Sequence, residues 1–195
     1  MISNEIQITY ISVNGSEISP LMLAFQELHG DLGKGIKLYS FSGESLSETE
    51  LIMNEAPKSD VVIIRLHGGK KSLPGYDRLI SSIRQSKALL HIQDSSCIDA
   101  ELVNASTKGY DYQQIFQYIS FGGKANLKNL LIFFVNRICG TDLSLSMPIM
   151  PPWDGIYHPE FDHVPSLEEY WQKRIKPEKL TIGLWFNISM WQAQD

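Results

Sequence analysis

The stretch Asp60–Gly69, DVVIIRLHGG, limits the possible folds of this chain more than any other part of the sequence. Val61–Ile64 are consecutive β-branched apolar residues with no polar residue among them. A strand with one solvated face alternates apolar and polar residues, whereas a strand covered on both faces reads as a continuous apolar run. The stretch therefore predicts a buried strand of a parallel sheet. Parallel strands need crossover connections, which are usually helices.

Strand and helix patterns alternate along the first 140 residues. β-branched and aromatic runs that end at turn residues predict further strands at 6–13, 35–43 and 88–94. Helical patterns occupy the ranges 18–30, 45–56, 75–87, 111–122 and 126–138. This order predicts an α/β fold with a doubly wound, mainly parallel sheet of the flavodoxin-like or Rossmann-like type. We expect residues 1–145 to form this N-terminal head domain.

The pattern changes after residue 139. Residues 139–166 hold five of the nine prolines and show no helical or alternating period. A helix with a Ser166–Glu169 capping box follows at 166–177, and a buried strand follows at 179–191. We therefore expect residues 146–195 to be a Pro-rich linker followed by a helix and a strand that begin the next α/β region. Such a helix-strand unit suggests a piece of a longer polypeptide.

Composition excludes several classes of function. The chain has 17 Lys and Arg against 22 Asp and Glu, a net charge of -5, and no clustered basic footprint for nucleic acid. The N-terminus lacks the pattern of a signal peptide, and no apolar run reaches the length of a membrane helix. Cys97 and Cys139 fit no CxxC pattern, and we expect buried free thiols. These features predict a cytoplasmic protein with no membrane span.

Residues at the carboxyl end of the central strand are the first candidates for a ligand site. In open α/β sheets, ligands bind beyond the carboxyl ends of the strands, near a switch in strand order. Arg65 and His67 face the same side, and a guanidinium in an apolar strand needs a partner, either a carboxylate or a ligand. Gly68 and Gly69 open the loop HGGKKS, which reads either as an anion-binding turn or as a plain strand-to-helix turn, because the Walker spacing is missing. His91 reads as a hydrogen-bonded core histidine.

The stretch 153–164, WDGIYHPEFDHV, is a weaker candidate for a metal site. Asp154, His158 and His163 are ligand types for zinc, cobalt or iron. Pro159 forbids a helix interior, so the HExxH arrangement is excluded and only a loop could gather the three side chains. A connecting loop explains the stretch equally well, and we expect no resident metal.

Three blocks of the sequence, taken together, resemble a known family. They are SDVVIIRLHGGKKSLPGYDRL at 59–79, YISFGGKANLKNLLIFFVNRI at 118–138, and GIYHPEFDHVPSLEEYWQKRIKPEKLTIGLWFNISMW at 155–191. In order and spacing they are similar to the N-terminal region of the cobaltochelatase large subunit (CobN type) and the magnesium chelatase H subunit. Asn187, Ile188 and Met190 depart from the family pattern, which usually has Tyr, Arg and His there, so a polar role at these positions is not expected.

The resemblance implies a role in metal insertion. The family inserts cobalt or magnesium, its substrate metal, into a tetrapyrrole or corrin ring during cobalamin-type biosynthesis, and separate AAA+ subunits hydrolyse the ATP. The expectation is an N-terminal domain that contributes to tetrapyrrole binding or subunit assembly with the remainder of the large subunit. It would bind no cofactor directly and would not catalyse insertion alone. Two alternatives remain open, a stand-alone flavodoxin-like module for small molecules or anions, and a metal-dependent hydrolase that uses Asp154, His158 and His163.

Overall fold

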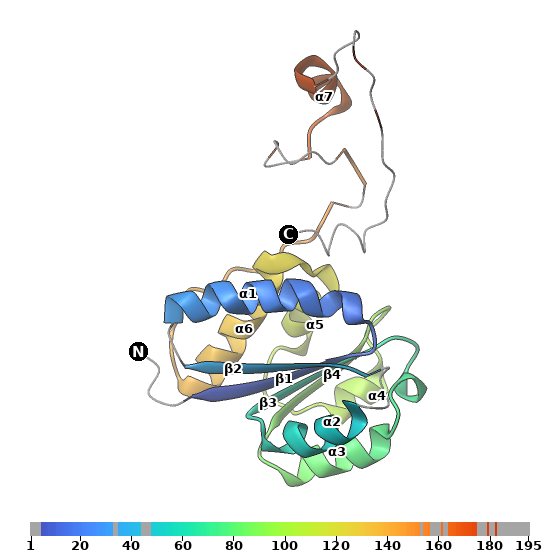
Figure 1. Cartoon of the computed structure of the whole chain (residues 1–195), viewed down its shortest axis with the longest axis vertical. Coiled ribbons are helices and arrows are strands. Elements are labelled where there is room, and N and C mark those ends of the chain that lie inside the picture. The colour runs from blue at the N-terminus through green and yellow to red at the C-terminus, as the bar shows by residue number, and fades with distance from the viewer. Residues whose placement is uncertain are drawn as a thin grey trace.

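The computed structural model describes residues 5–32, 35–43, 48–152, 154–156, 161, 164–174, 179 and 182. Its centre is a four-stranded parallel sheet with helices on both faces (Figure 1). The predicted doubly wound α/β class is confirmed. In the described part of the chain, no helix is long and apolar enough to cross a membrane.

The four strands lie where the sequence predicts them. They are β1 (Ile6–Ser12), β2 (Ile36–Ser42), β3 (Val61–Leu66) and β4 (Leu89–Asp94), in the order β2-β1-β3-β4. Every residue of β3 is buried, as its unbroken apolar run requires. The order 2-1-3-4 is that of flavodoxin-like sheets, in which strand order reverses between β1 and β3.

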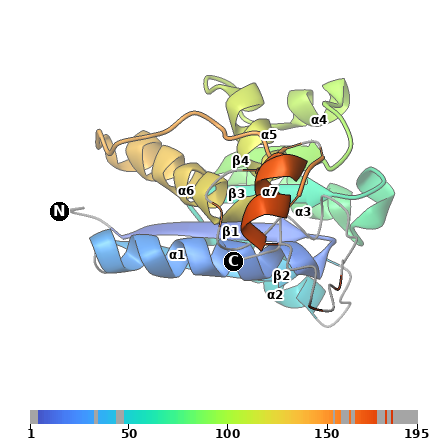
Figure 2. The ribbon, with the colours of Figure 1, turned by 90° about the horizontal axis from the view of Figure 1, so that it is seen from above.

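One face of the sheet is covered by α1 (Ile18–Leu32), α5 (Tyr112–Phe121) and α6 (Gly123–Cys139). Helices α1 and α6 lie side by side on this face (Figures 1 and 2). The core between them joins alternate residues of β1, such as Ile8 and Tyr10, to Leu21, Tyr118 and Phe134. We call this face the α6 face.

The opposite face is covered by α2 (Thr49–Glu55), η3 (Ala56–Lys58), α3 (Tyr76–Gln85) and α4 (Ala100–Ala105), and η4 (Lys70–Ser72) lies in the loop that leads from β3 to α3. The predicted stripe of α3, namely Tyr76, Leu79, Ile80 and Ile83, is buried here. Alternation along β3 divides its side chains between the two cores, since Val62 and Ile64 face α3 while Ile63 faces α6.

Two local expectations are wrong, and one helix was not predicted. The first predicted helix begins at Ile18, directly after the short 3-10 turn η1 (Gly15–Glu17), but it continues through Gly30 to Leu32 rather than stopping at Gly30. Helix α4 was not predicted, because six residues are too few to show a helical period. Cys97 is exposed rather than buried, since it lies in the loop between β4 and α4.

The C-terminal part contains an extended segment and one described helix. Residues 140–152 form neither helix nor strand, and α7 (Leu167–Arg174) follows, apart from the sheet layers in Figure 1. The predicted cap of this helix is present, since the Glu169 amide donates to Ser166 Oγ over 3.1 Å. The predicted strand at 179–191 lies outside the described residues except for two positions. The domain boundary at 145 stays a prediction, although hydrogen bonds to α6 continue as far as Ile149.

Candidate functional site

A row of polar residues crosses the sheet near its carboxyl edge, at the last residue of β1 and β2 and one residue before the end of β3 and β4. Ser42 of β2 pairs with Ser12 of β1, Ser12 pairs with Arg65 of β3, and Arg65 pairs with Gln93 of β4. Side chains that pair in register project to the same face, so this row ends the apolar core of the α6 face. The row crosses the point between β1 and β3 where strand order reverses. It is therefore the position at which open α/β sheets bind ligands.

Arg65 is the most constrained member of the row. Only 8% of the residue is exposed, and its Nη1 lies 3.1 Å from Glu17 Oε1 and donates to the Ile119 carbonyl over 3.0 Å. Its Nε is buried without a hydrogen-bond partner among the described residues. The guanidinium stays charged at any ordinary pH, so burying it requires the carboxylate. Of the two partners that the sequence allowed, the structure shows a carboxylate.

Glu17 is the residue that sequence reasoning missed. It ends η1, directly after β1, and its carboxylate accepts from Ser12 Oγ over 2.7 Å and lies 2.9 Å from His67 Nε2. Tyr10 Oη also donates to it, over 3.4 Å. Arg65 and His67, paired in the prediction, therefore share one acceptor. An acidic residue at the same sheet edge as a buried arginine was the signal available in the sequence.

Electrostatics keep Tyr10 protonated in this cluster. Burial, reinforced by the nearby Glu17 carboxylate, raises the pKa of Tyr10 well above its ordinary value. The phenol therefore acts as a hydrogen-bond donor at neutral pH. With Ser12, Arg65 and His67 it surrounds Glu17 by donors, and such a carboxylate is held in one geometry.

Gly68 and Gly69 form the turn that the sequence offered as an anion site. Both have positive φ, 96° and 77°, which an L side chain rarely adopts. Their amides donate to Asp94 Oδ2 over 3.2 and 2.9 Å, so the protein's own carboxylate fills the position of an anion. Burial alone would raise the pKa of Asp94, but hydrogen bonds from Ser96, Gly69 and Gly68 outweigh it and lower that pKa. An external anion would have to displace Asp94.

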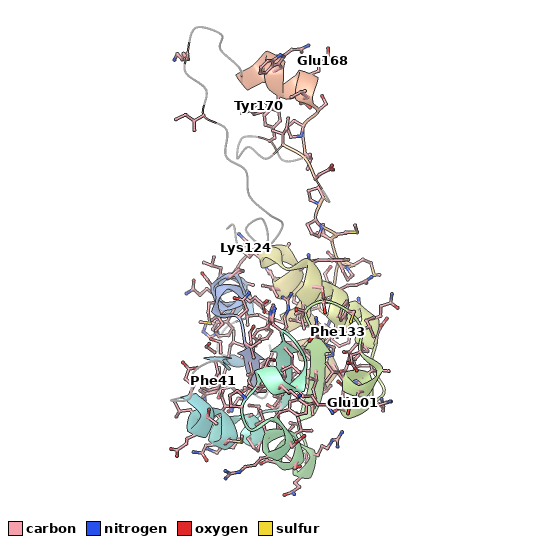
Figure 3. All side chains as sticks on the ribbon, turned by 90° about the vertical axis from the view of Figure 1, so that its right-hand side faces the viewer. Phe41, Glu101, Lys124, Phe133, Glu168 and Tyr170 are labelled. Atoms are coloured by element: carbon pink, nitrogen blue, oxygen red, sulfur yellow. The ribbon has the colours of Figure 1, made fainter. Side chains whose placement is uncertain are left out.

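The loop that follows carries further positive charge. Lys70 forms an ion pair with Glu101 of α4 and lies 5.7 Å from the centre of the Tyr76 ring (Figure 3 labels Glu101). Glu101 is exposed, and so is Lys71, which follows Lys70 on η4. The carboxyl edge thus offers His67 and Lys71 to solvent around a buried ion pair.

His91 lies one rung deeper on the same face and is a core histidine, as expected. Its Nδ1 is 2.8 Å from Tyr110 Oη and its Nε2 is 2.8 Å from Gln93 Oε1. One neutral tautomer satisfies both contacts, with Nε2–H donating to Gln93. Burial lowers the pKa of His91 to about 4, so the ring is neutral at physiological pH.

A cavity of about 360 Å³ lies at the opposite, amino edge of the sheet. It is lined by the start of β4 and the end of α4, with Arg84, Lys87 and Lys108 among its residues. These three side chains are exposed, and the volume is near the lower limit for ligand pockets. This cavity is separate from the switch point and from the predicted residues.

The described part of the metal candidate shows no centre. Asp154 is exposed, and His158 and His163 lie outside the described residues. Among the residues that the structure describes, no three His, Cys, Asp or Glu side chains are grouped as metal ligands. A metal site in this loop therefore stays a hypothesis from the sequence.

Comparison with known proteins now bears on this fold. Residues 116–195 match the family model described as CobN/Magnesium Chelatase, so the match runs from α5 to the last residue of the sequence. The matched segment, 80 of the 195 residues, is similar to the CobN/magnesium chelatase family. It contains two of the three sequence blocks that carried the resemblance, those at 118–138 and 155–191.

A solved structure shows the same fold. The match is the "Catalytic Subunit of Cobaltochelatase from Mycobacterium tuberculosis", with a TM-score of 0.59 and 20% identity. It covers 80% of this chain but only 12% of the cobaltochelatase chain, so at this identity it compares folds alone. No curated protein matches the sequence. The similarity to the CobN/magnesium chelatase family therefore rests on the family model over residues 116–195, and the solved structure shows only that the fold is shared.

Proposed function

We propose that this chain is the N-terminal domain of a cobalt or magnesium chelatase large subunit, and that its main role is assembly with the remainder of that subunit. The observation that carries the proposal is the CobN/magnesium chelatase match over residues 116–195, which begins within the α/β body and continues past it. The matched structure has the same fold in 12% of its length. A domain of this size needs the rest of such a subunit to enclose a macrocycle.

The switch-point cluster favours a structural role over tight ligand capture. Glu17 already pairs with Arg65 and His67, and Asp94 already fills the Gly68–Gly69 turn. A ligand that approached this edge would meet satisfied groups. Lys71 is exposed and His67 is partly exposed, so these two side chains could pair with the carboxylates of a tetrapyrrole, His67 through the ring nitrogen that does not face Glu17. The domain would then contribute peripheral contacts to the macrocycle.

In this proposal the metal ion is a substrate, cobalt or magnesium, and the ring is a corrin precursor or another tetrapyrrole. ATP would be hydrolysed by AAA+ partner subunits rather than by this chain. The absence of a GxxxxGK[ST] loop from the sequence agrees with that division of labour. A cytoplasmic location follows for a protein that works on soluble tetrapyrroles.

Titration separates assembly from ring binding. Protoporphyrin added to the isolated chain should leave the fluorescence of its four tryptophans and the porphyrin absorbance band unchanged up to high micromolar concentration. The same chain should form a complex with the remainder of a chelatase large subunit, supplied as a separate polypeptide, in analytical gel filtration. Saturable porphyrin binding that His67→Ala with Lys71→Ala weakens would instead assign the edge to the ring. A chain that neither forms the complex nor binds porphyrin would contradict the chelatase proposal.

The flavodoxin-like module is the second candidate, and the strand order favours it, because the order reverses between β1 and β3, where the polar row lies. A small anion such as inorganic phosphate would then compete with Asp94 for the Gly68 and Gly69 amides. Chemical-shift changes at these two amides on phosphate addition would support this function. The hydrolase with Asp154, His158 and His163 gains no support from the described residues.

A further inference from the structure

Residues 141–149, which we call the strap, run back along α6 in an extended conformation. Asn126, Asn129 and Asn136 of α6 are spaced by three and seven residues, so they share one side of the helix. They contact the strap in reverse order, since Asn136 meets Leu143 and Asn126 meets Ile149. Ten helical residues span about 15 Å, and six strap residues cover that length only when extended.

Two asparagines form hydrogen bonds with the backbone of the strap. Asn136 Nδ2 donates to the Leu143 carbonyl over 2.9 Å, and the Leu143 amide donates back to Asn136 Oδ1 over 2.8 Å. Asn126 and Ile149 repeat the same two-way pair, with both distances 2.8 Å. A side-chain amide that both donates to and accepts from one residue forms the same two hydrogen bonds that a paired residue of a neighbouring strand forms. These pairs require no particular side chain on the strap.

The middle of the strap is held in the same manner. The Ser146 amide donates to Asn129 Oδ1 over 2.8 Å, and Tyr118 of α5 donates to the Ser146 carbonyl. Strap side chains supply the remaining contact. Leu143 and Leu145 are partly buried against the core of the α6 face, whereas Met147 is 73% exposed. The interaction thus combines backbone pairing with two leucine anchors.

We propose that α5 and α6 form a binding site for an extended peptide of the pattern Leu-x-Leu, and that the strap is its built-in, exchangeable ligand. Part of the site is held without the strap, because Asn126 Nδ2 is also bonded to the Gly122 carbonyl over 2.8 Å. The strap occupies it because attachment to the same chain gives a high effective concentration. Release of the strap would free the chain after residue 140 and present the asparagines to a second extended segment. This inference does not depend on the proposed chelatase function.

A strap-release variant tests the site in the full chain. Leu143→Pro with Ile149→Pro removes both donating amides and cannot be held by Asn136 or Asn126. A fluorescently labelled peptide of residues 141–152, TDLSLSMPIMPP, is then titrated and followed by anisotropy. We expect the peptide to bind the release variant at least tenfold more tightly than it binds the unmodified chain. Adding Asn126→Ala with Asn136→Ala should abolish that gain, and Asn54→Ala, an exposed asparagine on α2, should not.

A peptide with both leucines changed to serine is the ligand control, and it should bind at least tenfold more weakly. Circular dichroism and thermal melting verify that each variant keeps its fold. Equal binding to the release variant and the unmodified chain, or binding that survives loss of both asparagines, would overturn the proposal.

Hydrogen exchange gives a second test that needs no release variant. In Asn126→Ala with Asn136→Ala, the Leu143 and Ile149 amides should exchange at least tenfold faster, with the amides of β1 and β3 unchanged. Unchanged exchange at both strap amides would show that the asparagines do not retain the strap, and the inference would fail.

Discussion

Replacing Glu17 with alanine tests whether the buried ion pair organises the carboxyl edge of the sheet. The change leaves the Arg65 guanidinium, in a residue only 8% exposed, without its carboxylate. Breaking a buried pair by removing one partner costs about 3 to 5 kcal/mol. We expect about 3 kcal/mol here, because Arg65 keeps the Ile119 carbonyl and the Glu17 side chain is 14% exposed. That loss is a large part of a typical domain stability of about 5 to 15 kcal/mol.

Urea unfolding at pH 7 measures the loss. With a slope of about 2 kcal/mol per molar urea, the midpoint should fall by roughly 1.5 M. Glu50→Ala is the control, because Glu50 is an exposed carboxylate in the first turn of α2, and its free energy of unfolding should stay within about 0.5 kcal/mol of the parent's.

A charge-free double variant completes the cycle. Arg65→Met with Glu17→Gln removes both charges, and it should recover at least half of the stability that Glu17→Ala loses, because no uncompensated ion stays buried. A Glu17→Ala loss below about 1 kcal/mol would refute the reasoning, since it would mean that water reaches Arg65. A double variant that is no more stable than Glu17→Ala would refute it as well.

Three further changes test the neighbouring groups. The pKa of His91 is about 4 in the fold and 6.5 in the unfolded chain, so its contribution is complete above pH 6.5 and is lost as pH falls toward 4, by about 3 kcal/mol at most. His91→Gln should remove that slope from urea midpoints measured between pH 7 and 4.5. Asp94→Ala should cost about 2 kcal/mol at pH 7, because the Gly69 amide loses its acceptor. The lowered pKa of Asp94 means that its contribution is present above pH 3.8 and disappears as pH falls through the folded value. Asp99→Ala should lower stability by about 1 kcal/mol in thermal melts, because Asp99 caps α4 at the Glu101 and Leu102 amides.

Each of these three predictions would be contradicted by a specific result. An unchanged pH slope in His91→Gln would show that other groups cause it. If Asp94→Ala is as stable as the parent, water or an anion replaces the carboxylate at the glycine turn. Asp111 is also an N-cap, of α5, but accepts from the Gln114 amide alone, so Asp111→Ala is a comparison variant for Asp99→Ala, and its loss should be no larger.

The sheet could be predicted because buried strands appear in the sequence as continuous apolar runs. Val61–Ile64 can be tolerated only where both faces are covered, and the neighbouring runs at 6–13 and 88–94 repeat the pattern. Strand order could not be read in the same way, because all four strands are similar in length and apolar on the inside. The pairing of β1 between β2 and β3 follows from how the helices pack on the two faces.

Half of the candidate site could be predicted as well. Arg65 could be recognised as a charged residue in an apolar strand, and its need for a carboxylate or ligand partner followed from the free-energy cost of burying an unpaired guanidinium. Sequence alone could not choose among the acidic residues near the sheet edge. Glu17 became the partner because η1 turns it back over Ser12, and a 3-10 turn of three residues leaves almost no periodic signal.

The strap shows a different limit of sequence reasoning. Its prolines and missing period predicted a linker, because those rules look for a segment that forms its own helix or strand. The strap forms neither, and its backbone groups are satisfied by side chains 7 to 28 residues away in the chain, on α6 and α5. Asn126, Asn129 and Asn136 are poor helix formers relative to alanine or leucine, which is a cost that the helix carries at three positions of one stripe. Three such residues on one side of a helix are the signal for an extended segment that needs hydrogen bonds, and this pattern can be searched for in other helices that precede Pro-rich stretches.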